Sequence, residues 1–254
     1  MKLIFLYAVF SIVFTTISLP QNSFSILKGS AIIGITRNDT IWFGADSKTT
    51  HSDVLGNTRI QCKIINAGNI VVAHLGLMND FFTNINIDTI ITNCVKDGKN
   101  TKLIINYLNK TMIYTLQYIS TIAIMGNKYS IGDTLHSYHT GFLIATNEES
   151  EPTLHHFEYI TTVVEKVPKN SFLTKTELIS KLYQVKTGIL NYCPLGFSIL
   201  SENIIKYQNS IIPNLINELI RREIQKSPDK IGEPISIIQI TKDNIKWIQR
   251  GLCK

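Results

Sequence analysis

The sequence is poor in charge and has no strongly basic segment. Charged residues make up 17% of its 254 residues, and Lys plus Arg exceed Asp plus Glu by only 25 to 19. The nearest approach to a basic cluster is Arg221-Arg222 followed by Lys226 and Lys230. A nucleic-acid-binding protein concentrates basic and aromatic side chains on one surface. This dispersed surplus therefore argues against a nucleic-acid partner.

Cysteine is scarce and widely spaced. The sequence has four cysteines and no Cys-x-x-Cys pair, namely Cys62, Cys94, Cys193 and Cys253. This spacing argues against a zinc site and against a thioredoxin-like redox motif. In an oxidising compartment the four residues allow one or two disulfides, and the sequence does not determine their pairing.

The histidines are not arranged as a recognisable set of metal ligands. His136 and His139 are three residues apart, and His155 and His156 are adjacent. Adjacent residues on a strand point to opposite faces, and no carboxylate or cysteine completes a ligand set with either pair. We therefore expect no metal and no other cofactor.

Long apolar runs are also missing, except at the start of the chain. Lys2 precedes an apolar run from Leu3 to Leu19, and Pro20 follows it. The run falls short of the ~20 residues that a membrane-spanning helix needs. A positive start, an apolar run and small residues near possible cleavage points predict a signal peptide over residues 1–25. We expect a secreted or periplasmic protein without a stable membrane span after signal cleavage; the alternatives are an N-terminal membrane anchor and a buried helix.

The remaining sequence alternates between strand and helix patterns. Short apolar runs bounded by turn residues predict strands at 31–36, 40–45, 60–65, 69–75, 139–146, 153–159, 161–167, 235–240 and 245–248. Apolar residues at helical spacing predict helices at 79–95, 102–124, 175–189 and 211–225. Residues 190–210 match neither pattern. Since hairpin-length turns join successive strands, this order predicts an α+β protein with antiparallel sheets covered by helices.

Two segments near the start carry a recognisable pattern. They are Gly29-Ser30-Ala31-Ile32-Ile33-Gly34-Ile35 and Trp42-Phe43-Gly44-Ala45-Asp46-Ser47-Lys48-Thr49-Thr50. These segments resemble the proteasome β-subunit family of N-terminal nucleophile (Ntn) hydrolases. In that family a glycine precedes the nucleophile, and an aspartate follows the nucleophile after 16 residues, as Asp46 follows Ser30.

Three later segments extend the resemblance from about residue 29 to residue 248. The segment 59–64 is similar to the family's lysine-bearing strand, with Lys63 one residue late, which implies an insertion in the loop 49–57. The segment 71–80 resembles the strand, turn and helix start that carry the oxyanion-hole glycine, here Gly76. The segment 229–234 resembles the family's Asp-x-x-Ser-Gly-Gly. The resemblance implies a four-layer αββα sandwich of two antiparallel sheets.

The resemblance also implies a set of catalytic roles. Cleavage of the Gly29-Ser30 bond would expose Ser30 as nucleophile, with its own α-amine as the base. This division makes residues 26–29 a short propeptide and residues 30–254 the hydrolase domain. Lys63 would hold the amine neutral, and Asp46 would pair with Lys63. The amide of Gly76 would stabilise the oxyanion, and Asp229 would support the N-terminus.

The sequence departs from the family at several positions. The family's usual nucleophile is threonine, Gly232 stands where the Asp-x-x-Ser motif places a second serine, and no Gly-Ser-Gly segment precedes the third helix. The first hypothesis is hydrolysis of amide bonds in a peptide or a small amide. The alternative is a catalytically silent, proteasome-like scaffold for binding or assembly. A homo-oligomer is possible in either case.

Overall fold

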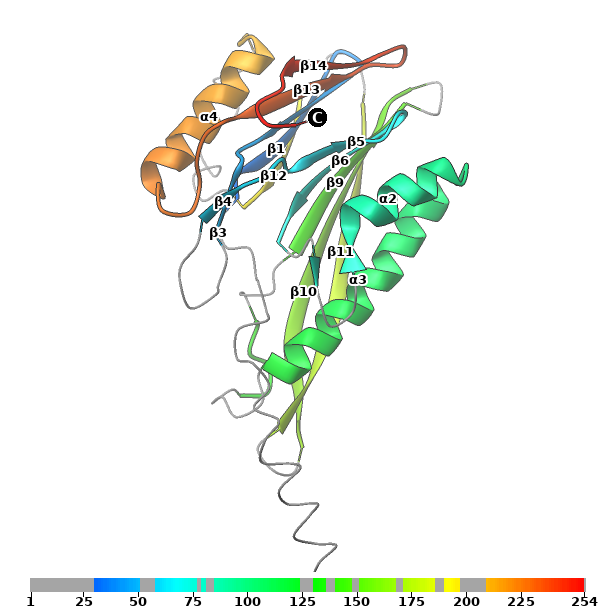
Figure 1. The fold of residues 1–254 in the computed structure, drawn as a ribbon, viewed down its shortest axis with the longest axis vertical. Coiled ribbons are helices and arrows are strands. Elements are labelled where there is room, and N and C mark those ends of the chain that lie inside the picture. Colours follow the sequence, from blue (N-terminus) through cyan, green and yellow to red (C-terminus); the bar gives the residue numbers. More distant parts are fainter. Residues whose placement is uncertain are drawn as a thin grey trace, which may run out of the picture.

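A computed structural model describes residues 30–50, 58–76, 79–80, 85–123, 130–135, 140–147, 151–167, 171–185, 190–196 and 209–253. These residues form two five-stranded antiparallel sheets, two short hairpins and three helices (Figure 1). The prediction of an α+β protein with antiparallel sheets is confirmed. The predicted signal peptide and propeptide lie outside the described residues. Among the helices that the structure describes, none is long and apolar enough to cross a membrane.

The first sheet is assembled from strands at both ends of the chain. In spatial order its strands are β12 (Asn191–Leu195), β1 (Ile32–Arg37), β2 (Thr40–Ala45), β13 (Ser236–Ile240) and β14 (Ile245–Gln249). Asn38 and Asp39 form the tight turn between β1 and β2 with φ of +49° and +56°, a conformation that Asn and Asp tolerate better than most residues. The resulting register pairs Ile32 with Ala45 and so brings the start of β1 beside the end of β2.

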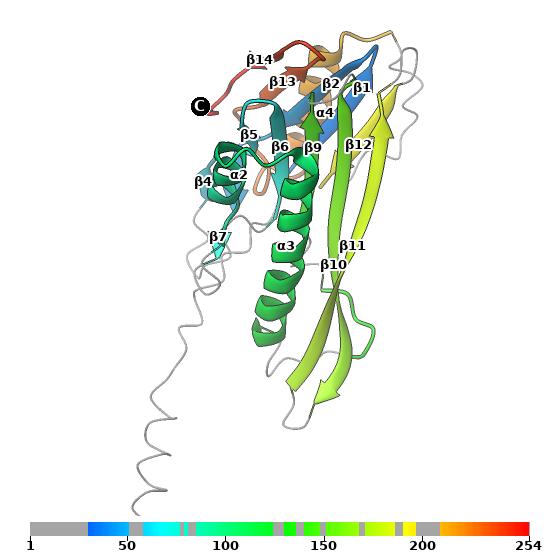
Figure 2. The ribbon, with the colours of Figure 1, turned by 90° about the vertical axis from the view of Figure 1, so that its right-hand side faces the viewer.

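The second sheet comes from the middle of the chain. In spatial order its strands are β11 (Ser171–Gln184), β10 (Thr153–Val167), β9 (Thr140–Thr146), β6 (Ile70–Leu75) and β5 (Ile64–Asn66). β10 and β11 are much longer than their neighbours and project as a twisted hairpin beyond the rest of the sheet (Figure 2). Only the first half of β10, as far as Tyr159, pairs with β9.

Three helices pack on these sheets. They are α2 (Ile87–Lys96), α3 (Thr101–Ala123) and α4 (Ile212–Lys226). The Asn86 side chain caps α2 by accepting a hydrogen bond from the Thr89 amide at 2.8 Å, which satisfies one of the free N–H groups at the helix start. The two short hairpins are β3 (Lys48–Thr50) with β4 (Thr58–Ile60), and β7 (Asn79–Asp80) with β8 (Ile85–Asn86).

The buried apolar side chains form three clusters. One cluster joins α2 and α3 to the second sheet, and another joins α4 to the first sheet. The third contains residues of both sheets, among them Phe43 from the first and Leu143 from the second. Successive residues of β1 illustrate the division, since Ile32 belongs to the cluster between the sheets and Ile33 to the cluster with α4. This alternation is the period of two that a strand buried on both faces requires.

The prediction of a helix over residues 175–189 is wrong, because residues 171–184 form β11. The apolar residues Leu178 and Leu182 are four apart, a spacing that is also compatible with a helix. The burial pattern has period two instead: Thr174 and Thr176 are buried, whereas the lysine and glutamate beside them are exposed. Pairing with β10 along the whole strand decides the conformation, a long-range effect that local periodicity does not report. Residues 186–189 lie outside the described part.

Three other predicted boundaries are corrected. The helix expected over residues 79–95 begins only at Ile87, and Asp80 lies in β7 instead of opening that helix. The strand expected over residues 60–65 is interrupted at residues 61–63. The two strands expected at 153–159 and 161–167 are one continuous strand, β10. Each error falls where strand pairing sets the boundary, whether with a neighbour in the chain, as between β7 and β8, or with a distant strand, as between β10 and β11.

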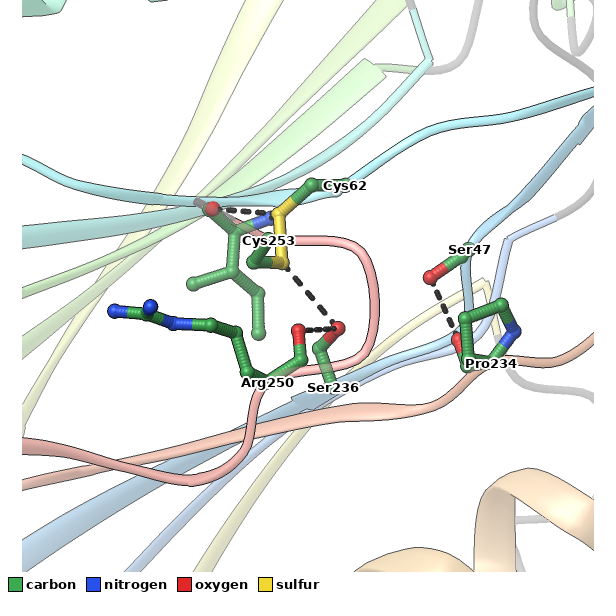
Figure 3. The surroundings of a disulfide bond; sticks show 7 residues. Ser47, Cys62, Pro234, Ser236, Arg250 and Cys253 are labelled. Carbon is green, nitrogen blue, oxygen red and sulfur yellow. Dashed lines mark hydrogen bonds between the residues drawn. A yellow bond between two sulfur atoms is a disulfide. The ribbon is translucent and has the colours of Figure 1, made fainter.

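A disulfide joins Cys62 to Cys253 across 191 residues of sequence (Figure 3). It ties the segment after β14 to the residue that precedes Lys63. Ser236 of β13 supports this end of the chain, because its hydroxyl donates to the Arg250 carbonyl at 3.0 Å. The other two cysteines, Cys94 and Cys193, are free and buried.

We expect the double variant C62S/C253S to lose about 3–5 kcal/mol of unfolding free energy, because this disulfide closes a very long loop in the unfolded chain. Urea unfolding of the oxidised protein and of the double variant measures the difference. Adding a reductant should destabilise the wild type to a similar extent and leave the double variant unchanged. A loss below about 1 kcal/mol would show that the bridge is structurally dispensable.

Candidate active site

The centre of the candidate site is the carboxylate of Asp46, which directly follows β2. The side chain is fully buried, and both of its oxygens are used. Oδ1 accepts hydrogen bonds from Lys63 Nζ at 2.7 Å and from the Ala31 amide at 2.8 Å. Oδ2 accepts from the amides of Lys48 at 3.1 Å and Gly232 at 3.2 Å. Four donors from four parts of the chain thus compensate the burial of one charge.

Lys63 is the cation of this site and lies just before β5. Only 2% of the residue is exposed, and Nζ also donates to the Lys48 carbonyl at 2.6 Å. Burial lowers the pKa of the Lys63 ammonium, and the Asp46 carboxylate opposes this by attracting the proton. The pair is therefore a desolvated ion pair in which each charge depends on the other.

Ser30 lies two residues before the first residue of β1 and is 3% exposed. The amide that follows it, that of Ala31, binds the same carboxylate oxygen as Lys63 Nζ. The structure therefore pairs Asp46 with Lys63, as the sequence predicts, and places the Ala31 amide, next to Ser30, on the same carboxylate. The tight β1–β2 turn explains the contact between Ala31 and Asp46. The register of this hairpin pairs Ile32 with Ala45 and so places Ala31 beside Asp46.

Gly196 also belongs to this site, although no motif in the sequence points to it. It follows β12, and its backbone has φ of +72°. A side-chain carbon at this position would lie 2.1 Å from the Ser30 carbonyl oxygen and 3.2 Å from Leu75 Cδ1. Only glycine allows this approach, so β12 packs directly against the start of β1. The sequence signal for this residue is a glycine at the end of a strand. The strand itself is not predicted, because residues 190–210 match neither the strand pattern nor the helix pattern.

Gly76 and Asp229, the two other predicted site residues, differ in their position relative to Asp46. Gly76 is buried and directly follows β6 with φ of +88°, next to Leu75, which reaches the Gly196–Ser30 contact. Asp229 is exposed in the turn at residues 228–230. Within the described part of the chain, no hydrogen bond joins Asp229 to Asp46 or Lys63. The structure therefore brings the end of β6 toward Ser30, whereas it leaves Asp229 on the surface.

The segment before β13 reaches the site through Gly232 and its neighbours. The Ser47 amide donates to the Gly232 carbonyl at 3.1 Å, and the Ser47 hydroxyl donates to the Pro234 carbonyl at 2.6 Å (Figure 3). A side-chain carbon at Gly232 would lie 2.9 Å from Lys48 Cδ. Gly232 thus contributes a backbone amide to Asp46 at the position where the resembling family has a serine.

His74 is a buried neighbour of the site, and no motif role in the sequence points to it. Its backbone amide donates to the Lys63 carbonyl at 3.1 Å, and its ring donates to the Cys62 carbonyl. Among the described residues, Nε2 has no hydrogen-bond partner. Burial, together with the positive charge of Lys63, lowers the pKa of the His74 ring from 6.5 to about 3. His74 is therefore neutral at physiological pH.

This depressed pKa predicts a pH-dependent loss of stability below pH 6.5. In the unfolded chain the ring binds a proton near pH 6.5, whereas in the folded protein it does so only near pH 3. As the pH falls through this window, protons bind to the unfolded state and favour it. From pH 7 to pH 5 we expect His74 to account for a loss of about 2 kcal/mol.

Urea unfolding at both pH values tests this with the variant His74→Asn, whose amide retains a donor for the Cys62 carbonyl. The wild type should lose about 2 kcal/mol more than the variant between pH 7 and pH 5. Equal losses would mean that the ring reaches solvent or a proton acceptor in the folded state.

The described residues add no metal-binding group to this site, and comparison with protein families and curated proteins adds no relative. The described residues contain no group of three or more His, Cys, Asp or Glu that could hold a metal ion, and His136 and His139 lie outside them. No model of a protein family matches the chain, and no curated protein matches it. The interpretation therefore rests on the geometry of the site and on the motif resemblance.

Proposed function

We propose that this protein is an exported Ntn hydrolase, divergent from the proteasome β subunits, that cleaves amide bonds through Ser30. The observation that carries the proposal is the shared oxygen of Asp46, which binds both Lys63 Nζ and the amide next to Ser30. A buried ion pair costs desolvation and is a poor source of stability by itself. Its placement beside a strand-start serine is better explained by chemistry at that serine.

The proposed reaction begins with cleavage of the Gly29-Ser30 bond, which converts an amide nitrogen into an α-amine. The free amine, with an ordinary pKa of roughly 8, accepts the proton of the Ser30 hydroxyl. The positive charge of Lys63 disfavours protonation of that amine before the reaction, and Asp46 holds Lys63 in place.

The Ser30 oxygen then attacks the carbonyl carbon of the substrate amide. The backbone amide of Gly76 stabilises the oxygen that becomes negative. The α-amine, now protonated, gives its proton to the leaving nitrogen, and the C–N bond breaks to leave an ester on Ser30. A water molecule, deprotonated by the same amine, cleaves the ester and restores the hydroxyl. The substrate class is a peptide or a small amide.

The finer architecture that we propose is a four-layer αββα sandwich. The cluster with residues from both sheets supports a sheet-on-sheet interface, and the two outer clusters support helix layers, α4 on one side and α2 with α3 on the other. Export is part of the same proposal. The Cys62–Cys253 disulfide is consistent with an oxidising compartment.

A catalytically silent scaffold is the second candidate, and two observations favour it. Asp229 is exposed, and Gly232 replaces a serine of the motif, so the hydrogen-bond network expected around the N-terminus is incomplete. Such a protein would retain the fold for binding or assembly. It would have no need for a reactive Ser30.

Covalent labelling distinguishes the two candidates. A peptide-like β-lactone acylates an activated serine hydroxyl when its ring opens, without a leaving group. We expect intact mass spectrometry to show one adduct on the processed wild type, and peptide mapping to place that adduct on Ser30. An unlabelled protein, or an adduct elsewhere that persists in Ser30→Ala, would reject the hydrolase and favour the scaffold.

A further inference from the structure

The outer edge of β11 is a long strand edge that pairs with no other described strand. β11 is 14 residues long and is the first strand of its sheet, so β10 pairs with one side of it and no described strand pairs with the other. An open edge of this length presents unpaired backbone donors and acceptors to any strand that can align with it. Figure 2 shows the strand running along the projecting hairpin.

One face of β11 is fixed against α3. The Thr174 hydroxyl lies 2.8 Å from the Ser120 hydroxyl and 2.9 Å from the Thr121 hydroxyl of α3. The Thr176 hydroxyl lies 2.9 Å from that of Thr161 in β10. These contacts anchor the strand to α3 and to β10, so its edge is a rigid template and not a fraying end.

The opposite face of β11 is exposed and has a symmetric pattern. It presents Leu173, Lys175, Glu177 and Ile179 in succession. Leu173 is 41% and Ile179 54% exposed, and Lys175 Nζ forms a surface ion pair with Glu177 Oε1 at 2.8 Å. The pattern apolar, basic, acidic, apolar is complementary to itself when it is reversed about its centre, Thr176.

We propose that β11 is a self-association site at which two copies of this chain pair their edge strands antiparallel about a twofold axis at Thr176. In that register Lys175 lies opposite Glu177 of the second copy, and Leu173 lies opposite Ile179 of the second copy. Twofold symmetry repeats each contact, which gives two ion pairs and two apolar pairs. The proposal is independent of any activity of Ser30.

The charge pattern also selects this register over its neighbours. A pairing centred on Leu178 would place Lys175 opposite Lys181 of the second copy. A pairing centred on Lys175 or on Glu177 would place identical charges opposite each other, which is destabilising. A lysine on an edge strand usually blocks pairing, but in the register centred on Thr176 the second copy's Glu177 lies opposite Lys175 and neutralises its charge.

Charge exchange tests the proposal without disturbing the fold, because Lys175 and Glu177 are each about 60% exposed (61% and 59%). Sedimentation velocity of the exported chain, at concentrations up to about 500 µM, should show a monomer–dimer equilibrium. K175E alone and E177K alone should each raise the dimer dissociation constant at least about tenfold, since both attractive pairs become repulsive.

Recombining the charges gives the decisive result. The double variant K175E/E177K should dimerise like the wild type, and a mixture of the two single variants should form a heterodimer although neither dimerises alone. K242E and D243K make the same charge changes in the exposed turn between β13 and β14 and should leave the equilibrium unchanged. A monomeric wild type, single variants that dimerise normally, or a mixture that stays monomeric would overturn the proposal.

Discussion

Replacing Asp46 with alanine should lower the free energy of unfolding by about 3–5 kcal/mol. The variant leaves the Lys63 ammonium buried without its counter-charge and removes the acceptor of three backbone amides, those of Ala31, Lys48 and Gly232. Each unsatisfied buried group adds its desolvation cost. Urea unfolding followed by circular dichroism measures the loss.

A matched control separates this effect from the loss of a surface charge. Asp243 is exposed in the turn between β13 and β14, and Asp243→Ala should change the unfolding free energy by less than about 0.5 kcal/mol. If Asp46→Ala were as mild as this control, the buried ion pair would not be a structural centre of the protein, and the site described around it would lose its basis.

Replacing Lys63 with methionine should slow acylation of Ser30 by about a thousandfold and shift its pH dependence upward. The positive charge of Lys63 keeps the pKa of the proposed α-amine low, because two neighbouring positive charges repel each other. Without that charge the amine remains protonated to higher pH, so the rate should reach its plateau only in more alkaline solution. The rate of β-lactone labelling as a function of pH measures both effects.

The control for Lys63→Met is Lys48→Met, which removes a nearby lysine whose Nζ donates to the Pro228 carbonyl instead of Asp46. Lys48→Met should leave both the rate and the pH profile close to those of the wild type. A purely structural role for Lys63 would slow labelling without moving the pH profile. That result would remove Lys63 from the proposed mechanism.

The sequence predicts the contact between Asp46 and the residues before β1 because this contact is local. The turn at Asn38-Asp39 joins two apolar runs of equal length, and this hairpin aligns Ala31 with Asp46 through its register. The motif resemblance adds Lys63. Because these residues lie within one short stretch of chain, their spacing carries most of the geometry.

The features that the sequence did not reveal depend on distant contacts. Gly196 approaches Ser30 from a strand formed far along the chain, and Cys62 meets Cys253 from the opposite end. The strand at residues 171–184 resembled a helix because its apolar spacing is ambiguous, and only pairing with β10 resolves it. Burial of His74 likewise follows from packing that no local pattern encodes.

The most direct test of the central claim is the N-terminal residue of the mature protein, determined by intact mass and N-terminal sequencing for the wild type and for Ser30→Ala. We predict that the wild type begins at Ser30 and that the variant retains residues before it, because the hydroxyl of Ser30 is needed to cleave its own peptide bond. If both chains begin at the same residue upstream of Ser30, no α-amine base forms there, and the hydrolase proposal is contradicted.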